Sequence, residues 1–206
     1  SKFEDEFANY VGAGEAIGFP SGRSSLAALL IANGVEPGGE VLLTGMTCEA
    51  VPQAVLAIGA TYKWVDINLP LLAMNPELAA DAVTPATQAI VVQHSFGLSV
   101  DLEPFRTLAT QRNLAIIEDC CIALGSSYPD GTLIGTGEFD AFWSFEVSKT
   151  MSAGWGGIAM VKDPERAART RSIRDSAGKH GRVRSAQTLS QAAISAMCYR
   201  PQLTGL

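Results

Sequence analysis

The sequence has few features of membrane-bound, secreted or nucleic-acid-binding proteins. It contains no run of eighteen apolar residues and no signal-like N-terminus, so we expect neither a membrane span nor secretion. Its 4 cysteines have neither CxxC spacing nor the density of a disulfide scaffold, which favours a reducing cytoplasm. A formal net charge of -6 over 206 residues argues against a general nucleic-acid binder, because phosphate backbones select a net basic surface. No dinucleotide glycine spacing, P-loop or metal-ligand pattern is present.

The basic residues are unevenly distributed along the chain. Eight of the 15 Lys and Arg residues lie between Lys162 and Arg184. The arginines at helical spacing within this stretch are Arg166, Arg169, Arg171 and Arg174. The pattern indicates either a solvated helix face followed by a flexible basic loop, or an anion-binding or subunit-facing element.

Short apolar segments alternate with longer amphipathic ones over most of the chain. This alternation predicts an α/β fold, a three-layer sandwich whose central sheet is mainly parallel and has about seven strands. We expect strands at 16–19, 40–44, 61–65, 89–93, 115–119, 141–145 and 157–161. We expect helices at 3–10, 24–31, 48–58, 75–82, 101–112, 164–176 and 189–199.

Two strand ends carry residues suited to cofactor chemistry. Lys149 lies in a loop between two expected core strands, and the strand 115–119 ends in Glu118 and Asp119. A loop lysine alone is usually a solvated surface charge. A lysine amine together with a strand-end carboxylate, however, is what pyridoxal 5'-phosphate (PLP) requires, as a Schiff-base lysine and an acid partner for the pyridinium nitrogen. Because strand residues alternate, Glu118 faces the other way and is expected to serve structure.

Further candidates come from neighbouring strand ends. The turn 21–24 begins a helix, so its N–H groups and the positive end of the helix dipole could bind a phosphate. Arg23 could hold the same phosphate by its charge. The alternative is that the turn is a simple N-cap of the helix. Ser144 lies near the end of the strand 141–145 and could donate its hydroxyl to the same phosphate. His94 directly follows the strand 89–93, where it either lines this cleft or is a hydrogen-bonded core histidine.

The order and spacing of several segments between residues 3 and 175 resemble the DegT/StrS family of PLP-dependent sugar aminotransferases, within the fold-type-I (aspartate aminotransferase) superfamily. The segments are FANYVGAGEAIGFPSGRSSLAALL, GVEPGGEVLLTGMTCEAVPQAVLAIGATYKWVDI, VTPATQAIVVQHSFG, LAIIEDCCIALGS and FWSFEVSKTMSAGWGGIAMV. The resemblance implies a PLP-binding large domain at residues 1–175. Residues 176–206, a basic loop and a helix, would begin a C-terminal part. Because relatives carry a further small domain, we expect the chain to be a fragment or incomplete.

The resemblance also implies roles for individual residues. Lys149 would form the Schiff base with PLP, Asp119 would pair with the pyridinium nitrogen, and Ser144 with the turn at Gly22 and Arg23 would bind the phosphate. The implied reaction is amino transfer from a donor such as glutamate to a keto-sugar nucleotide or similar polyol. The implied assembly is a cytoplasmic homodimer.

Several positions differ from the family pattern. Arg23 replaces a threonine in the phosphate turn, Cys48 replaces the aromatic residue that stacks on the cofactor ring, and Ile122 replaces a hydrogen-bonding glutamine. Cys48 is still expected beside the cofactor, with less stacking surface, and His94 is expected in the same cleft. Two alternatives stay open: a non-catalytic relative that holds PLP or a partner protein, and another fold-type-I reaction such as that of a lyase or racemase.

Overall fold

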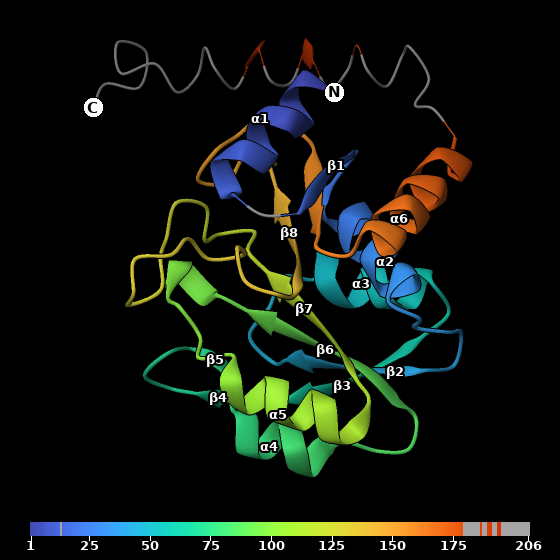
Figure 1. The fold of residues 1–206 in the computed structure, drawn as a ribbon, viewed down its shortest axis with the longest axis vertical. Helices are drawn as coiled ribbons and strands as arrows, with labels where there is room; N and C mark the ends of the chain where they lie inside the picture. The colour runs from blue at the N-terminus through green and yellow to red at the C-terminus, as the bar shows by residue number, and fades with distance from the viewer. Residues whose placement is uncertain (13, 179–185, 187–188, 191–192, 195–206) are drawn as a thin grey trace.

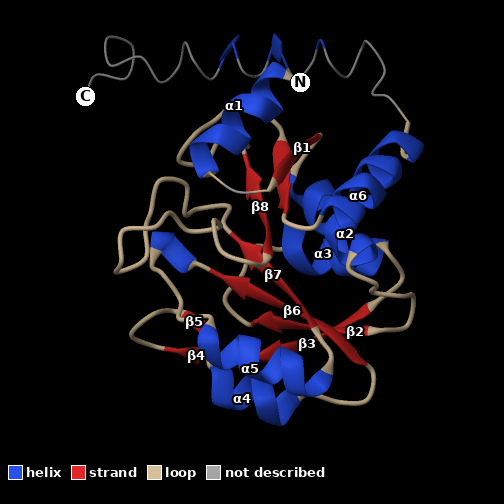
Figure 2. Ribbon diagram, viewed as in Figure 1, coloured by secondary structure: helices blue, strands red, loops and turns tan. Residues whose placement is uncertain are grey.

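The computed structural model describes residues 1–12, 14–178, 186, 189–190 and 193–194. A seven-stranded sheet is covered by helices on both faces (Figures 1 and 2), which confirms the expected α/β sandwich. The strands of this sheet are β1 (Glu15–Phe19), β2 (Glu40–Thr44), β3 (Thr61–Val65), β6 (Thr87–Gln93), β7 (Ala115–Asp119), β8 (Asp140–Ser144) and β9 (Gly157–Val161). The helices are α1 (Lys2–Val11), α2 (Gly22–Ala32), α3 (Ala50–Ala57), α4 (Pro76–Ala82), α5 (Glu103–Arg112) and α6 (Pro164–Ser176). A small hairpin, β4 (Ile67–Asn68) and β5 (Ala73–Met74), and a 3-10 turn, η1 (Ser95–Gly97), complete the elements.

The strand directions bring one set of loops to one edge of the sheet. The strand order is β1-β9-β8-β7-β6-β2-β3. The pairs among β3, β2, β6, β7 and β8 are parallel, whereas β9 is antiparallel to both of its neighbours, β8 and β1. Six strands therefore point the same way and β9 alone is reversed. The carboxyl ends of the six meet the amino end of β9 at one edge.

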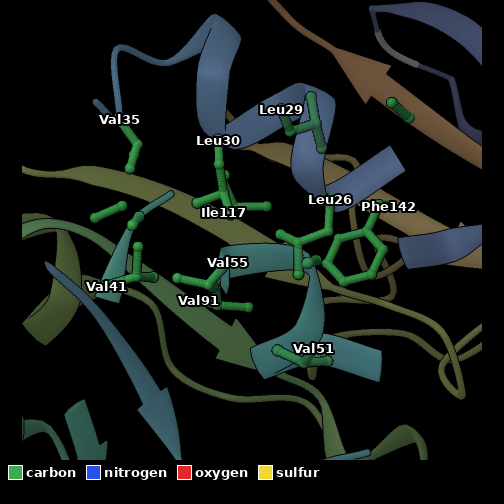
Figure 3. Packing of buried hydrophobic residues seen from close by; sticks show 14 of the residues in the cluster. Leu26, Leu29, Leu30, Val35, Val41, Val51, Val55, Val91, Ile117 and Phe142 are labelled. Atoms are coloured by element: carbon green, nitrogen blue, oxygen red, sulfur yellow. The ribbon is translucent and has the colours of Figure 1, made fainter. Parts of the chain in front are cut away.

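Three buried apolar clusters fill the space between the layers. Helices α2, α3 and α6 cover one face, where Leu26, Leu29 and Leu30 of α2 pack towards α3 and the strands (Figure 3). Helices α4 and α5 cover the other face next to β6, around the buried Phe105. Helix α1 closes that face over β8 and β9, where the rings of Phe7 and Trp143 meet edge to face. Such burial is the main force that holds the sheet and fixes its edge.

The arginine-rich helix α6 is tied to the body of the domain. Its guanidinium groups reach acceptors on four separate segments: Arg166 to Asp140 at 3.0 Å, Arg169 to the carbonyl of Ala32 at 3.1 Å, Arg171 to Glu15 at 2.7 Å and Arg174 to Glu4 at 3.0 Å. The helix at 164–176 is confirmed, and these arginines join segments of the fold. The expected basic loop and the helix at 189–199 lie largely outside the described residues.

The described helices include none that is both long and apolar enough to cross a membrane.

Candidate functional site

A cavity of about 250 Å³ opens at the edge of the sheet where the six strands end. Its lining comes from the last residues of β6 and β7 and from the segments that follow β2, β6, β7 and β8: Met46, Thr47, Cys48, Gln93, Phe96, Asp119, Cys121, Ile122 and Lys149. Ligands of largely parallel sheets bind at such an edge. The volume is slightly below the roughly 300 Å³ at which typical small-molecule sites begin.

Asp119 is a buried carboxyl at the wall of this cavity. It is the last residue of β7 and 4% exposed, and its Oδ1 accepts the backbone N–H of Cys121 at 3.0 Å. Burial raises the pKa of Asp119, while the hydrogen bonds from the Cys121 backbone and thiol and the charge of Lys149 oppose that rise. A cationic N–H donor in the cavity would compensate the buried charge.

Lys149 reaches the same cavity from the loop between β8 and β9. The base of this loop is closed by two backbone bonds, from Phe145 N–H to the carbonyl of Gly156 at 2.9 Å and from Ala153 N–H to the carbonyl of Phe145 at 3.0 Å. Phe145 is buried in the core beneath α1. The half-buried Lys149 is therefore carried by a loop whose two ends are fixed to adjacent strands.

The start of α2 forms a cradle next to the cavity. The Ser21 hydroxyl caps the helix by accepting Ser24 N–H at 3.2 Å, so the N-cap given as the alternative role of this turn is present. Among the described residues, the N–H groups of Gly22 and Arg23 have no protein acceptor. A Cβ built on Gly22 would lie 2.9 Å from Ser144 Cβ and 3.4 Å from Cys121 Sγ. Gly22 therefore keeps this corner open between the helix N-terminus and the cavity wall.

The sequence candidates are distributed unevenly around this site. Lys149, Asp119 and Cys48 line the cavity. Gly22 lies close to Ser144 and to Cys121, and Cys121 is itself a lining residue. Arg23 lies in the first turn of α2 with an exposed side chain and is not part of the lining. The roles of these residues towards a cofactor stay predictions.

The expectation that His94 lines the cleft is wrong. His94 is fully buried on the opposite face, where its Nε2–H donates to Glu118 at 3.0 Å and its Nδ1 accepts Val100 N–H at 3.2 Å. The Tyr128 hydroxyl donates to the same Glu118 oxygen at 2.9 Å. His94 is one residue beyond the strand and turns to the side of Glu118, so the core-histidine alternative is the correct one.

The His94 cluster also has the residue types of a metal site. Within the described residues, ligand atoms of His94, Glu118 and Cys120 lie within 4.8 Å of one another. Because Val100 N–H donates to Nδ1, the proton of the neutral imidazole is on Nε2, which leaves that atom no lone pair for a metal. This cluster is better explained as a buried hydrogen-bonded network centred on Glu118 Oε2, although Glu118 Oε1 has no partner among the described residues.

Five lining residues were not among the sequence candidates: Met46, Thr47, Gln93, Phe96 and Cys121. Gln93 had a usable signal, because it is the polar end of an otherwise apolar strand. Phe96 has a left-handed backbone with φ of 54°, a conformation that a side chain of this size rarely adopts.

Most of the chain is similar to a known protein family. The profile of the DegT/DnrJ/EryC1/StrS aminotransferase family matches residues 1–202. Protein MosB of Rhizobium meliloti is 36% identical over 83% of this chain and 34% of its own length. The dTDP-3-amino-3,4,6-trideoxy-alpha-D-glucose transaminase of Streptomyces venezuelae is 37% identical over 84% of this chain and 46% of its own. The L-glutamine:2-deoxy-scyllo-inosose aminotransferase of Streptomyces kanamyceticus is 34% identical over 84% of this chain and 40% of its own length. The chain thus spans less than half the length of these relatives.

Solved structures of similar proteins have the same fold. DesV of S. venezuelae superposes with a TM-score of 0.81 at 35% identity, covering 88% of this chain and 49% of that one. NtdA of Bacillus subtilis, solved with bound cofactor PMP, superposes with a TM-score of 0.74 at 28% identity, covering 82% of this chain and 38% of that one. Taken with the profile match, these similarities show that the chain belongs to the DegT/DnrJ/EryC1/StrS aminotransferase family.

Proposed function

We propose that the protein is a PLP-dependent aminotransferase that passes an amino group from glutamate or glutamine to the carbonyl of a nucleotide-linked keto-sugar or a similar polyol. The observation that carries the proposal is the placement of the Lys149 amine and the buried Asp119 carboxyl in one cavity. Membership of an aminotransferase family and relatives named for sugar and inosose transamination support it.

The residues present fit PLP. Asp119 offers a buried carboxyl to a cationic ring nitrogen, and the corner between Gly22 and Ser144 offers free N–H groups and a hydroxyl to a phosphate. A Cβ at Gly22 would fill that corner. When bound, PLP supplies an electron sink that stabilises negative charge on the substrate carbon.

The residues of this chain would divide the remaining tasks. Lys149 Nζ would attach the cofactor covalently and then, as a free amine, take the proton from the substrate carbon that bears the amino group. Asp119 would hold the proton on the ring nitrogen. The apolar side chains of Met46, Phe96 and Ile122 would limit the access of water to these groups.

We extend the proposal to a cytoplasmic homodimer with a PLP-binding domain at residues 1–175 and the start of a C-terminal part at 176–206. The free thiols of Cys48, Cys120 and Cys121 suit a reducing compartment. Phe96, which lines the cavity, is 67% exposed, and Met151 in the lysine loop is 40% exposed. A second subunit would cover this apolar surface. Light scattering on the full-length protein measures the subunit number directly.

The attachment of PLP to Lys149 can be tested by absorption spectroscopy. The full-length protein with PLP should show a near-visible band that borohydride removes, and peptide mapping should locate the reduced adduct on Lys149. Lys149→Ala and Lys149→Arg should both abolish the adduct, because the first removes the amine and the second keeps only the charge. Lys2→Ala, an exposed lysine in α1, is the matched control. An adduct retained in both Lys149 variants would contradict the proposal.

Amino transfer needs a separate assay. Lys149→Ala should lower the rate of transfer from glutamate or glutamine to a keto-sugar nucleotide by about a hundredfold or more. Cys48 and Ile122 line the cavity where stacking and hydrogen-bonding residues are expected, which motivates the alternative of a non-catalytic PLP-binding relative. A trapped Lys149 adduct without transfer to any acceptor would favour that alternative.

A further inference from the structure

Gln93 lies next to Asp119 at the floor of the cavity. It is the last residue of β6, and in the parallel ladder with β7 it is the partner of Asp119. Both side chains line the cavity, and Gln93 is 8% exposed. A buried amide at this position must either bind a ligand or be satisfied by the protein.

The Gln93 amide is satisfied by the protein. Its Oε1 accepts the Thr47 hydroxyl at 2.5 Å, and its Nε2 donates to the carbonyl of Met46 at 3.0 Å and to the Ser95 hydroxyl at 2.9 Å. The orientation of the amide is fixed, because a backbone carbonyl can only accept. Both of its N–H donors are therefore used, and none is left for a ligand.

These bonds hold the turn that follows β2. Met46, Thr47 and Cys48 form this turn and all line the cavity. In the part of the chain that the structure describes, the side-chain hydrogen bonds of the turn all go to Gln93. Cys48, at the end of the turn, is exposed and makes none. Backbone bonds at the flanks, from Gly45 N–H to the Val65 carbonyl and from Val51 N–H to the Cys48 carbonyl, also hold the turn. Among the described side chains, Gln93 alone ties this cavity wall to the strand beside Asp119.

We infer that Gln93 is a positioning residue, which sets the Met46–Cys48 turn at a fixed separation from Asp119 so that a flat ring fits between the turn and the Lys149 loop. The inference rests on the proposed function, because the ring in question is that of PLP. A merely structural Gln93 would affect stability alone, whereas a positioning Gln93 also affects the affinity for the cofactor.

The first measurement is the dissociation constant of PLP for variants of the full-length protein, determined by absorbance titration. Gln93→Leu removes all three bonds at similar volume and should weaken PLP binding about tenfold. Thr47→Val removes one bond and should weaken it roughly threefold to fivefold, while Thr47→Ser, which keeps the hydroxyl, should bind PLP like the wild type. The double variant should bind no more weakly than Gln93→Leu alone, because both changes act through the same turn.

The second measurement follows the turn itself through the Cys48 thiol. Alkylation by iodoacetamide, read for the Cys48 peptide by mass spectrometry, should be slowed by PLP in the wild type. At saturating PLP this protection should be lost in Gln93→Leu. Protection and affinity equal to the wild type in Gln93→Leu, with a lower melting temperature only, would overturn the inference.

The outcomes separate the inference from the proposed function. A wild-type protein that binds no PLP would overturn both. A wild-type protein that binds PLP, with a Gln93→Leu variant of equal affinity, would overturn only the positioning role. If Gln93→Leu does not fold, the pair Thr47→Val and Thr47→Ser decides the question, because equal affinity in these two variants would overturn the role of the Gln93–Thr47 bond.

Discussion

Replacing Gly157 by alanine should destabilise the protein and disturb the α2 corner of the cavity together. Gly157 starts the reversed strand β9 at the edge where the site lies. A Cβ built there would lie 2.3 Å from the carbonyl carbon of Ser21 and 2.4 Å from the backbone nitrogen of Gly22. These are backbone atoms, so no rotamer change relieves the contact. Either β9 or the first turn of α2 must move.

The size of the effect follows from where the displaced atoms lie. Overpacking a well-packed interior costs about 1–3 kcal/mol, and a clash with backbone belongs at the upper end of that range. We expect a loss of about 3 kcal/mol, which corresponds to a melting temperature roughly 6–12 °C lower for a domain of this size. Because Gly22 moves with Ser21, PLP affinity should fall as well.

Urea unfolding followed by circular dichroism, with and without PLP, measures both effects. Gly45→Ala is the matched control, because the nearest atom to a Cβ there is the Val65 carbonyl oxygen at 3.8 Å. The control should change the free energy of unfolding by less than about 0.5 kcal/mol. A Gly157→Ala variant within 1 kcal/mol of the wild type, with normal PLP affinity, would show that the helix start and β9 do not need this close approach.

Two further predictions concern buried carboxyls. Burial raises the pKa of Asp119 above its ordinary value of 3.8, so its ionisation costs stability at neutral pH. Asp119→Asn should therefore melt at a higher temperature than the wild type at pH 7 without PLP, and this difference should disappear as the pH falls towards 3.8. The same variant should lower the rate of amino transfer by about a hundredfold or more. A variant that is less stable than the wild type at pH 7 would contradict the burial argument. Asp140, 1% exposed, accepts from Lys162 N–H at 2.9 Å, Asn33 at 2.9 Å and Arg166 at 3.0 Å. Asp140→Ala should cost about 3 kcal/mol in urea unfolding, whereas a loss below 1 kcal/mol would show that water replaces the carboxylate.

Most strands could be predicted because both of their faces are buried. The bounds expected for β2, β3, β7 and β9 are those of the structure. Strand β6 starts earlier than expected, at Thr87, because the Thr87 hydroxyl donates to Glu40 at 2.6 Å across the sheet. The hairpin of β4 and β5 was missed, because two-residue strands leave no periodic pattern. The reversal of β9 was missed as well, since a run buried on both faces does not indicate strand direction.

The positions of Asp119 and Lys149 in the site could be predicted from the ends of strands. The two residues meet because the strand that carries Asp119 and the strand that precedes the Lys149 loop end at one edge of the sheet. His94 was expected in the cleft and Gln93 was not, yet successive residues of a strand face opposite sides. The register pairs Gln93 with Asp119 and Val92 with Glu118. Only this pairing, which depends on the tertiary fold, shows that Gln93 faces the cavity and that His94 does not.

The pairing of β1 with β9 bears on how the chain folds during its synthesis. Glu15 is the ladder partner of Val161, and in the seven-stranded sheet β9 is the only neighbour of β1. At roughly 5–20 residues per second, the ribosome needs about 7–30 s to pass from one of these partners to the other. Strand β1 has no partner strand during this interval, so its edge is open to chaperones and to other nascent chains. Folding of this half of the sheet must therefore wait for the segment that also completes the lysine loop.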